Sequence, residues 1–479
     1  MAPGTTIGAL PPEIFQEIFS RVDEQRTIQQ SRFVCQKFNQ VASRYLITNT
    51  HVRMSSESIS RLENFCNHSV LSKSMAKVNI ILSCYDPNMA NDTALYMQDC
   101  DTQLFQRLEI LERMKSFRYG SDGEAEEEIE NQLQAVIGNQ EFAKISEEGF
   151  EESTATPFQK LAIRLHTMYK QRCTNQEEVR QDNNHIKRIC DALCKLSNIQ
   201  ELSFTDKPGS IREELKESDF EDLGLNRKTL KHFDFAVSPS KWCGSFTTAY
   251  SIVPPVEMLG ELCCQLGHHG VQPRTITMNL NAPSNLRLIW VSSDQQVGVR
   301  SLVAKATKLE LVVDGWARKN SLAENNDRPR DEMLALCSFT QHFFSAPNLE
   351  SLYIWFVEYP RFYEIPTVSL DDILPFQQSW PRLSDLELRY QPVSLRDLRT
   401  LVSLQGNTLK SFKCECVWLL DGGWDEAIRV IRDVENMEEV YVKYPRGERY
   451  GSGYGTHVDM PYDEVCRYIL KETDVNPLS

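Results

Sequence analysis

Apolar residues recur along the chain in one arrangement: an apolar residue, two others, a second apolar residue, one other, and a third apolar residue. The alternation at its end predicts a short strand with one buried face. The arrangement occurs at Met75-Val78-Ile80, Met114-Phe117-Tyr119, Ile199-Leu202-Phe204, Leu230-Phe233-Phe235, Leu349-Leu352-Ile354, Leu383-Leu386-Leu388, Leu409-Phe412-Cys414 and Met437-Val440-Val442. Two weaker strand candidates lie at 276–280 and 309–313.

Helical patterns precede several of these strand candidates, at residues 185–197, 331–344, 394–404 and 425–434. Strand, helix and strand joined by short links predict parallel strands with right-handed crossovers. From Leu349 onward the strand candidates start 34, 26 and 28 residues apart. This spacing and the L-x-x-L-x-L pattern resemble leucine-rich repeats. The alternative is an ordinary α/β sheet of unrelated units, because Val357, Gln391 and Val417 stand where that repeat has Asn or Cys.

The front of the chain, residues 10–46, has a different pattern. Apolar residues recur four apart at Leu10, Ile14, Ile18 and Val22, and a second set follows at Val34, Phe38, Val41 and Tyr45. Both sets predict amphipathic helices. Pro11 suits the start of the first helix, where a missing N–H leaves no hydrogen bond unmade.

The same stretch resembles an F-box: L-P-x-E-I begins at Leu10, I-F at Ile18, V-C-x-x-F at Val34 and V-A at Val41. The chain departs from that family's pattern with Gln29 and Ser31 in place of leucines and Phe38 in place of Trp. A plain helical hairpin that packs on its own domain is the alternative. The resemblance implies a fungal-type F-box protein whose apolar face docks on the Skp adaptor of a Skp–cullin–F-box ubiquitin ligase. The residues that match the family's adaptor-binding pattern are Leu10, Pro11, Ile14, Ile18, Val34, Cys35 and Phe38.

Composition narrows the class of protein. The chain has 479 residues, 41% of them hydrophobic and 25% charged, as in ordinary folded proteins. Its net charge of −15 argues against nucleic-acid binding, which needs a surplus of Lys and Arg. We expect no membrane span, because no run of about eighteen apolar residues is present, and no secretory signal, because residues 1–9 lack a charged start and an apolar core. The 14 scattered cysteines indicate reduced thiols in the cytoplasm or nucleus.

These patterns predict an α/β fold, with an N-terminal F-box helical module followed by an irregular leucine-rich-repeat-like βα solenoid. We place the F-box at 1–50 and a linking helix with the first repeat-like units at 51–119. Residues 120–157 are rich in acids and are expected to be a partly disordered insert. The repeat-like array then occupies 158–479.

No motif of catalysis or cofactor binding stands out, and we expect no cofactor. Cys263, Cys264, His268 and His269 lie close together in the chain, but their spacing matches no common zinc pattern, so we expect no metal site. A thiol-dependent enzyme that pairs a cysteine with His342 or His457 remains an alternative function.

Aromatic and basic residues follow the predicted strands. The carboxyl ends of parallel strands lie along one edge of a sheet, so the loops after them gather there. Trp, Tyr and Arg are the types most often found at the centre of protein interfaces. The candidate target-binding rim comprises Trp242, Trp316, Tyr359, Phe362, Tyr363, Tyr390, Trp418, Trp424, Arg446, Arg449 and Tyr450. The alternative for each residue is packing between neighbouring repeats.

The resemblance and the array together favour a non-catalytic substrate receptor. It would bind the Skp adaptor, and cullin through it, while the array holds an unidentified target protein close to the ubiquitin-charged enzyme. An adaptor-binding or repeat scaffold that acts outside a ligase is the main alternative.

Overall fold

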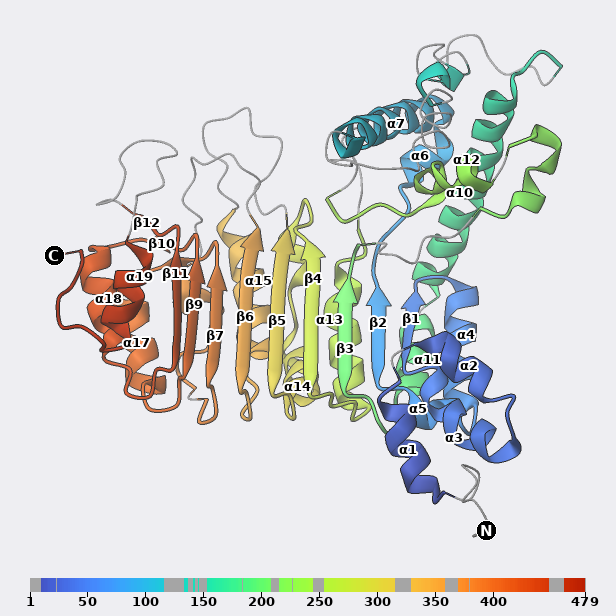
Figure 1. Ribbon diagram of the computed structural model, residues 1–479. Helices are drawn as coiled ribbons and strands as arrows, with labels where there is room; N and C mark the ends of the chain where they lie inside the picture. The colour runs from blue at the N-terminus through green and yellow to red at the C-terminus, as the bar shows by residue number, and fades with distance from the viewer. Residues whose placement is uncertain are drawn as a thin grey trace.

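The computed structural model describes residues 10–22, 24–115, 133–136, 141–142, 145, 153–182, 184–207, 215–225, 227–243, 254–314, 329–357, 369–378, 380–447 and 461–478. Within them the chain is mixed α/β and is built on a nine-stranded parallel sheet whose strands follow their order in the sequence (Figure 1). The strands are β1 (Asn49–Arg53), β2 (Lys77–Ile81), β3 (Glu201–Thr205), β4 (Thr275–Asn281), β5 (Lys308–Asp314), β6 (Ser351–Val357), β7 (Asp385–Arg389), β9 (Ser411–Glu415) and β11 (Glu439–Lys443). A second, three-stranded sheet pairs β12 (Arg446–Gly447), β10 (Trp418–Leu419) and β8 (Pro392–Val393).

Helices connect the strands and cover one face of the large sheet, where Figure 1 shows α13 and α15 behind it. The helices that lead into the sheet are α1 (Pro12–Ser20), α2 (Gln25–Ser31), α3 (Gln36–Leu46), α4 (Ser56–Asn67) and α5 (Leu71–Ser74). Those between β2 and β4 are α6 (Pro87–Asn91), α7 (Thr93–Lys115), α10 (Pro157–Gln181), α11 (Asn184–Leu193), α12 (Arg227–Lys231) and α13 (Glu257–His268). The remainder are α14 (Ser293–Val303), α15 (Arg330–Phe343), α16 (Leu370–Ile373), α17 (Leu395–Gln405), α18 (Trp424–Arg432) and α19 (Tyr462–Ile469). Short 3-10 turns lie at Glu217–Asp219, Glu221–Leu223, Asp234–Val237 and Leu286–Ile289.

Alternation along the strands decides which side chains form the core. In β3, Leu202 and Phe204 point into the helix layer and are fully buried, while the residues between them lie on the open face. The same register holds across the sheet, since Leu202 pairs with Ile276 and Leu352 with Leu386. The result is one continuous core that runs along the helix-covered face from Val52 to Ile469.

Two smaller cores lie apart from this one in the described part of the chain. The first is formed mainly by α6, α7, α10 and the turn at Asp234–Val237, which Figure 1 shows projecting beyond the carboxyl ends of β1 to β3. The second lies among α1, α2 and α3. The link from α3 to the sheet is short: the Thr48 carbonyl accepts hydrogen bonds from the backbone N–H groups of Ala76 (2.9 Å) and Lys77 (3.0 Å).

Most strand predictions are confirmed, including the two weaker candidates, which are β4 and β5. One prediction is wrong: the residues from Leu230 to Phe235 form the end of α12 and a 3-10 turn, because their apolar side chains pack into the second core instead of a sheet. Of the candidate at Met114-Phe117-Tyr119, Met114 lies in α7, and Phe117 and Tyr119 lie outside the described residues. The strand β1 was missed, and it also shows that the boundary expected at residue 50 falls inside a strand.

The expected acidic insert is described only in part. Its described apolar residues Leu133, Val136, Phe142 and Ile145 are buried in the second core, so this portion of the insert, which was expected to be only partly disordered, is packed. The remainder of 120–152 lies outside the described residues. None of the described helices combines the length and apolar character needed to cross a bilayer.

Candidate functional site

The module formed by α1, α2 and α3 has a core of its own. Phe15 and Phe19 of α1 are buried against the Phe38 ring, with edge-on ring centroids 4.8 and 5.7 Å away. Ile28 of α2 and Ala42 of α3 are buried in the same cluster. The inner side of each helix therefore packs against the other two helices of the module, and this small core needs no further partner.

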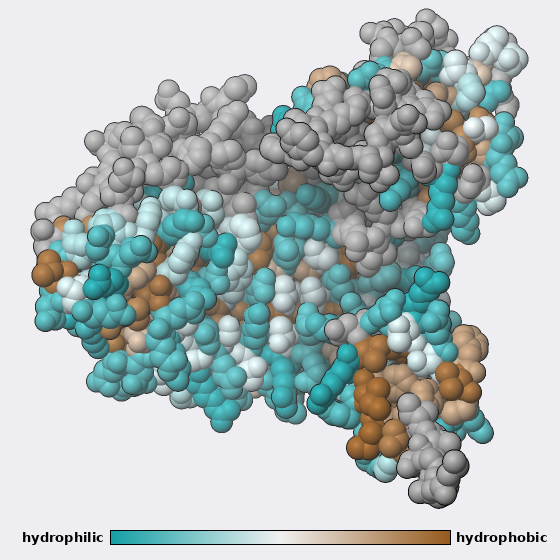
Figure 2. Space-filling model, viewed as in Figure 1, coloured by the Kyte–Doolittle hydropathy of each residue, from teal (hydrophilic) through white to brown (hydrophobic). Residues whose placement is uncertain are grey.

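A second apolar surface faces outward from this module. The exposed fractions of its large side chains are 46% for Ile14, 43% for Ile18, 89% for Phe33 and 65% for Val34. Ile14 and Ile18 lie one turn apart on α1, and Phe33 and Val34 lie in the turn that leads from α2 into α3. Figure 2 shows that the largest hydrophobic area in this view lies over α1–α3. Exposed apolar groupings of this kind mark interaction surfaces in proteins.

The seven residues expected to bind an adaptor divide into two groups. Pro11, Ile14, Ile18, Val34 and Cys35 are exposed. Leu10 and Phe38 instead pack against the inner core of the module, so they support the surface and form little of it.

Phe33 is the exposed residue that sequence reasoning missed. It lies outside both helical patterns, in the turn before Cys35, so helical periodicity gave no reason to select it. The broad apolar face expected for α1 also divides in two: positions 14 and 18 face outward, while Phe15 and Phe19 face inward.

Five of the candidate rim residues are described. Trp242 and Trp424 are buried, and each indole N–H donates a hydrogen bond of 2.8 Å to a backbone carbonyl, of Leu82 and of Arg446 respectively. The expectation that these two contact a target is therefore wrong, because their rings pack inside the molecule. Trp316, Tyr359, Phe362, Tyr363, Arg449 and Tyr450 lie outside the described residues.

Tyr390, Trp418 and Arg446 remain partly exposed at the carboxyl ends of β7, β9 and β11. The Arg446 guanidinium lies 6.0 Å from the centre of the Tyr390 ring, a cation–π distance. Burial, followed by the hydrogen bond to the Cys416 thiol, raises the pKa of Tyr390 to about 12. These residues form a compact group between neighbouring units and contribute only their outer edges to the surface.

Burial works against an activated nucleophile at several of the cysteines. All 14 are free, and burial raises the pKa of Cys190 to about 12 and of Cys264 to about 11. The Cys264 thiol lies 3.6 Å from His268 Nδ1, the contact closest to a Cys–His pair. A thiolate, the nucleophilic form, is thus disfavoured there. Among the described residues no three His, Cys, Asp or Glu side chains are grouped to hold a metal ion, and Cys263 and Cys264 are buried in α13. His457 lies outside the described residues.

Comparison with known proteins adds no further constraint. No family model matches the chain, and no curated protein matches it.

Proposed function

We propose that this chain is a substrate receptor of a Skp–cullin–F-box ubiquitin ligase, with α1–α3 as its F-box and the long parallel sheet as a leucine-rich-repeat-like array. The observation that carries the proposal is the outward apolar surface of Ile14, Ile18, Phe33 and Val34 on a module whose own core is complete. An adaptor that buried these side chains would gain roughly 1.5–3 kcal/mol from each before ordering costs.

The architecture of the large sheet supports the proposal that it is a leucine-rich-repeat-like array. Consecutive strands are neighbours in the sheet and helices link them, as in a solenoid of stacked units. Such an array presents an extended surface, and the short link at Thr48 holds the adaptor-binding module at a fixed place beside it. The receptor carries out no bond chemistry and acts by raising the local concentration of its target.

The test is co-purification with the Skp adaptor. The double substitution Ile14→Asp with Ile18→Asp places two charges on the outward face of α1, where burial against a partner leaves them desolvated. We expect adaptor capture to fall at least a hundredfold while circular dichroism of the array is unchanged, because Phe15 and Phe19 keep the inner core.

The matched control is Val297→Asp, which puts the same charge on an exposed apolar position of α14, away from the module. This variant should capture the adaptor like the unaltered chain. Adaptor capture that survives the double substitution on α1 contradicts the proposed function.

A further inference from the structure

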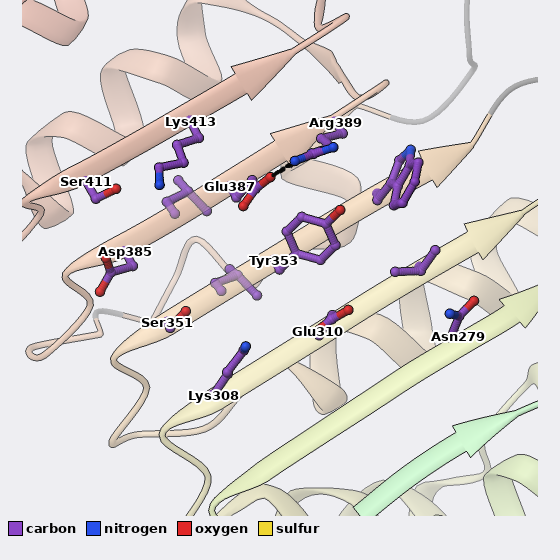
Figure 3. A pocket seen from close by; sticks show the side chains of 14 residues that line it. Asn279, Lys308, Glu310, Ser351, Tyr353, Asp385, Glu387, Arg389, Ser411 and Lys413 are labelled. Atoms are coloured by element: carbon purple, nitrogen blue, oxygen red, sulfur yellow. Dashed lines mark hydrogen bonds and ion pairs between the residues drawn. The ribbon is translucent and has the colours of Figure 1, made fainter. Parts of the chain in front are cut away.

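The open face of the large sheet carries a groove of about 460 Å³ across the middle strands. Figure 3 shows it from close by: the side chains come from β4, β5, β6, β7 and β9 and lie on the face opposite the helices. Five strands about 4.8 Å apart span roughly 19 Å, the length of about six extended residues. The groove therefore fits a stretch of extended chain and is too small for a folded domain.

An acidic side chain lies half-buried in this groove without a direct ion pair among the described residues. Glu310 of β5 forms no hydrogen bond or ion pair among the described residues. Burial is the main cause that raises the pKa of Glu310, and the neighbouring Glu387 and Glu201 carboxylates raise it further, while Lys308 opposes them. A cation placed beside Glu310 would offset the free-energy cost of burying its charged form and the repulsion from the neighbouring carboxylates.

Of the other charged side chains that line the groove, Arg389, Glu387 and Lys413 have ion-pair partners, while Lys308 and Asp385 have none among the described residues. The Arg389 guanidinium pairs with Glu387 (2.6 Å) and with Glu415 (3.1 Å). Lys413 pairs with Glu439 at 2.8 Å. Glu310 is thus a half-buried carboxylate without an ion-pair partner among the described residues, and Lys308 on the same strand is the cation that acts on it.

Aromatic rings lie directly beside this carboxylate. Tyr353 of β6 pairs in register with Glu310 on one side and Glu387 on the other, and Figure 3 shows its ring between the two. Arg389 demonstrates that a cation fits here, since its guanidinium carbon lies 5.7 Å from the Tyr353 ring centre and 5.5 Å from that of Trp355. A carboxylate next to an aromatic face is a favourable environment for a Lys or Arg side chain.

Two further polar atoms of the lining have no hydrogen-bond partner in the part of the chain that the structure describes. They are the Asn279 amide oxygen and the Trp355 indole nitrogen, and both are shielded from solvent. One is an acceptor and the other a donor, and an extended main chain supplies the complementary N–H and C=O groups. Binding that turns these side chains toward a peptide group removes the cost of leaving them unpaired.

We propose that the groove binds an extended segment of the target protein and that a Lys or Arg side chain of this segment packs on Tyr353 and pairs with Glu310. This inference rests on the proposed function, because it names the class of target segment that the receptor holds. The chain's net charge of −15 favours the approach of such a basic segment from a distance.

Fluorescence polarisation of the full chain tests the groove with two labelled octapeptides, one alternating Lys and Ser and one alternating Glu and Ser. We expect the basic peptide to bind and the acidic one to bind at least tenfold more weakly. Glu310→Gln and Tyr353→Leu should each weaken binding of the basic peptide about tenfold. Glu57→Gln removes the same charge from exposed α4, remote from the groove, and should have no effect.

Equal weakening by Glu310→Gln and Glu57→Gln would show that only the diffuse negative charge attracts the peptide, and would overturn the proposal, as would absence of binding. Circular dichroism of each variant confirms that it is folded. The Ile14→Asp with Ile18→Asp variant should still bind the peptide, and Glu310→Gln should still capture the adaptor. Loss of peptide binding with retained adaptor capture therefore rejects the groove and leaves the proposed function standing.

Discussion

Glu310 and Glu387 occupy the same row of the open sheet face, on either side of Tyr353, but their charges are balanced differently. Arg389 holds Glu387 through hydrogen bonds, whereas Glu310 has only the more distant Lys308. Because water is partly excluded from Glu310, the folded protein disfavours its charged form. The charged Glu310 therefore lowers the stability of the folded protein.

The pH dependence of unfolding gives a test at this residue. The raised pKa means that folded Glu310 holds its proton more tightly than the unfolded chain does, so its contribution to stability is present at low pH and lost as pH rises through the folded pKa. Glu310→Gln should therefore be more stable than the unaltered chain at pH 7, and the difference should vanish below about pH 4. Urea unfolding across this range measures it, and a difference independent of pH would contradict the assignment.

At the scale of single elements, alternating apolar positions predicted eight of the nine strands of the large sheet, because a strand buried on one face must repeat every second residue. The same rule failed at Leu230 to Phe235, where spacings of three and two residues also fit a helical turn that packs on α10. The candidate site was predictable in part. The apolar pattern identified Ile14 and Ile18, but it did not show that their side chains face outward. Whether a Trp such as Trp242 turns inward depends on partners distant in the chain, here Leu82 and Asp206.

The pair of helices α13 and α14 depends on a contact that no periodicity reveals. A Cβ atom added at Gly298 would lie 2.5 Å from the Cys264 carbonyl oxygen, and one added at Gly267 would lie 1.9 Å from the Gly298 carbonyl oxygen. The obstacles are backbone atoms, which cannot rotate away. Gly298→Ala should therefore lower the free energy of unfolding by about 3 kcal/mol, despite the better helix propensity of Ala.

Gly260→Ala on α13 is the control, because its added Cβ would meet a side-chain atom, Cγ1 of Val291, at 3.3 Å. A change within about 1 kcal/mol of zero is expected for it, since the propensity gain offsets the tight contact. Urea denaturation of the three proteins compares them. A loss for Gly298→Ala as small as that for Gly260→Ala would contradict the prediction and would mean that the two helices move apart at little cost.

At the scale of the whole molecule, the two ends of the described chain are attached differently. The module of α1–α3 has its own core and joins the sheet through a two-residue link, Ile47 and Thr48. At the other end, Val465 and Ile469 of α19 are fully buried in the main core, against α18 and β11. The first is an appended unit, while the second covers the end of the large sheet at β11.

Deletion of each end in turn tests whether the two ends are attached in these different ways. Deletion of residues 1–46 removes the separate core and should leave the urea midpoint of the array nearly unchanged while abolishing adaptor capture. Deletion of residues 461–479 is much shorter, but it exposes apolar groups of α18 and β11 to water and leaves cavities where Val465 and Ile469 packed, so the free energy of unfolding should fall by at least about 4 kcal/mol. If the longer deletion destabilised the sheet more than the shorter one, the module would be part of the core of the sheet. The proposal that α1–α3 form an independent docking unit would then be wrong.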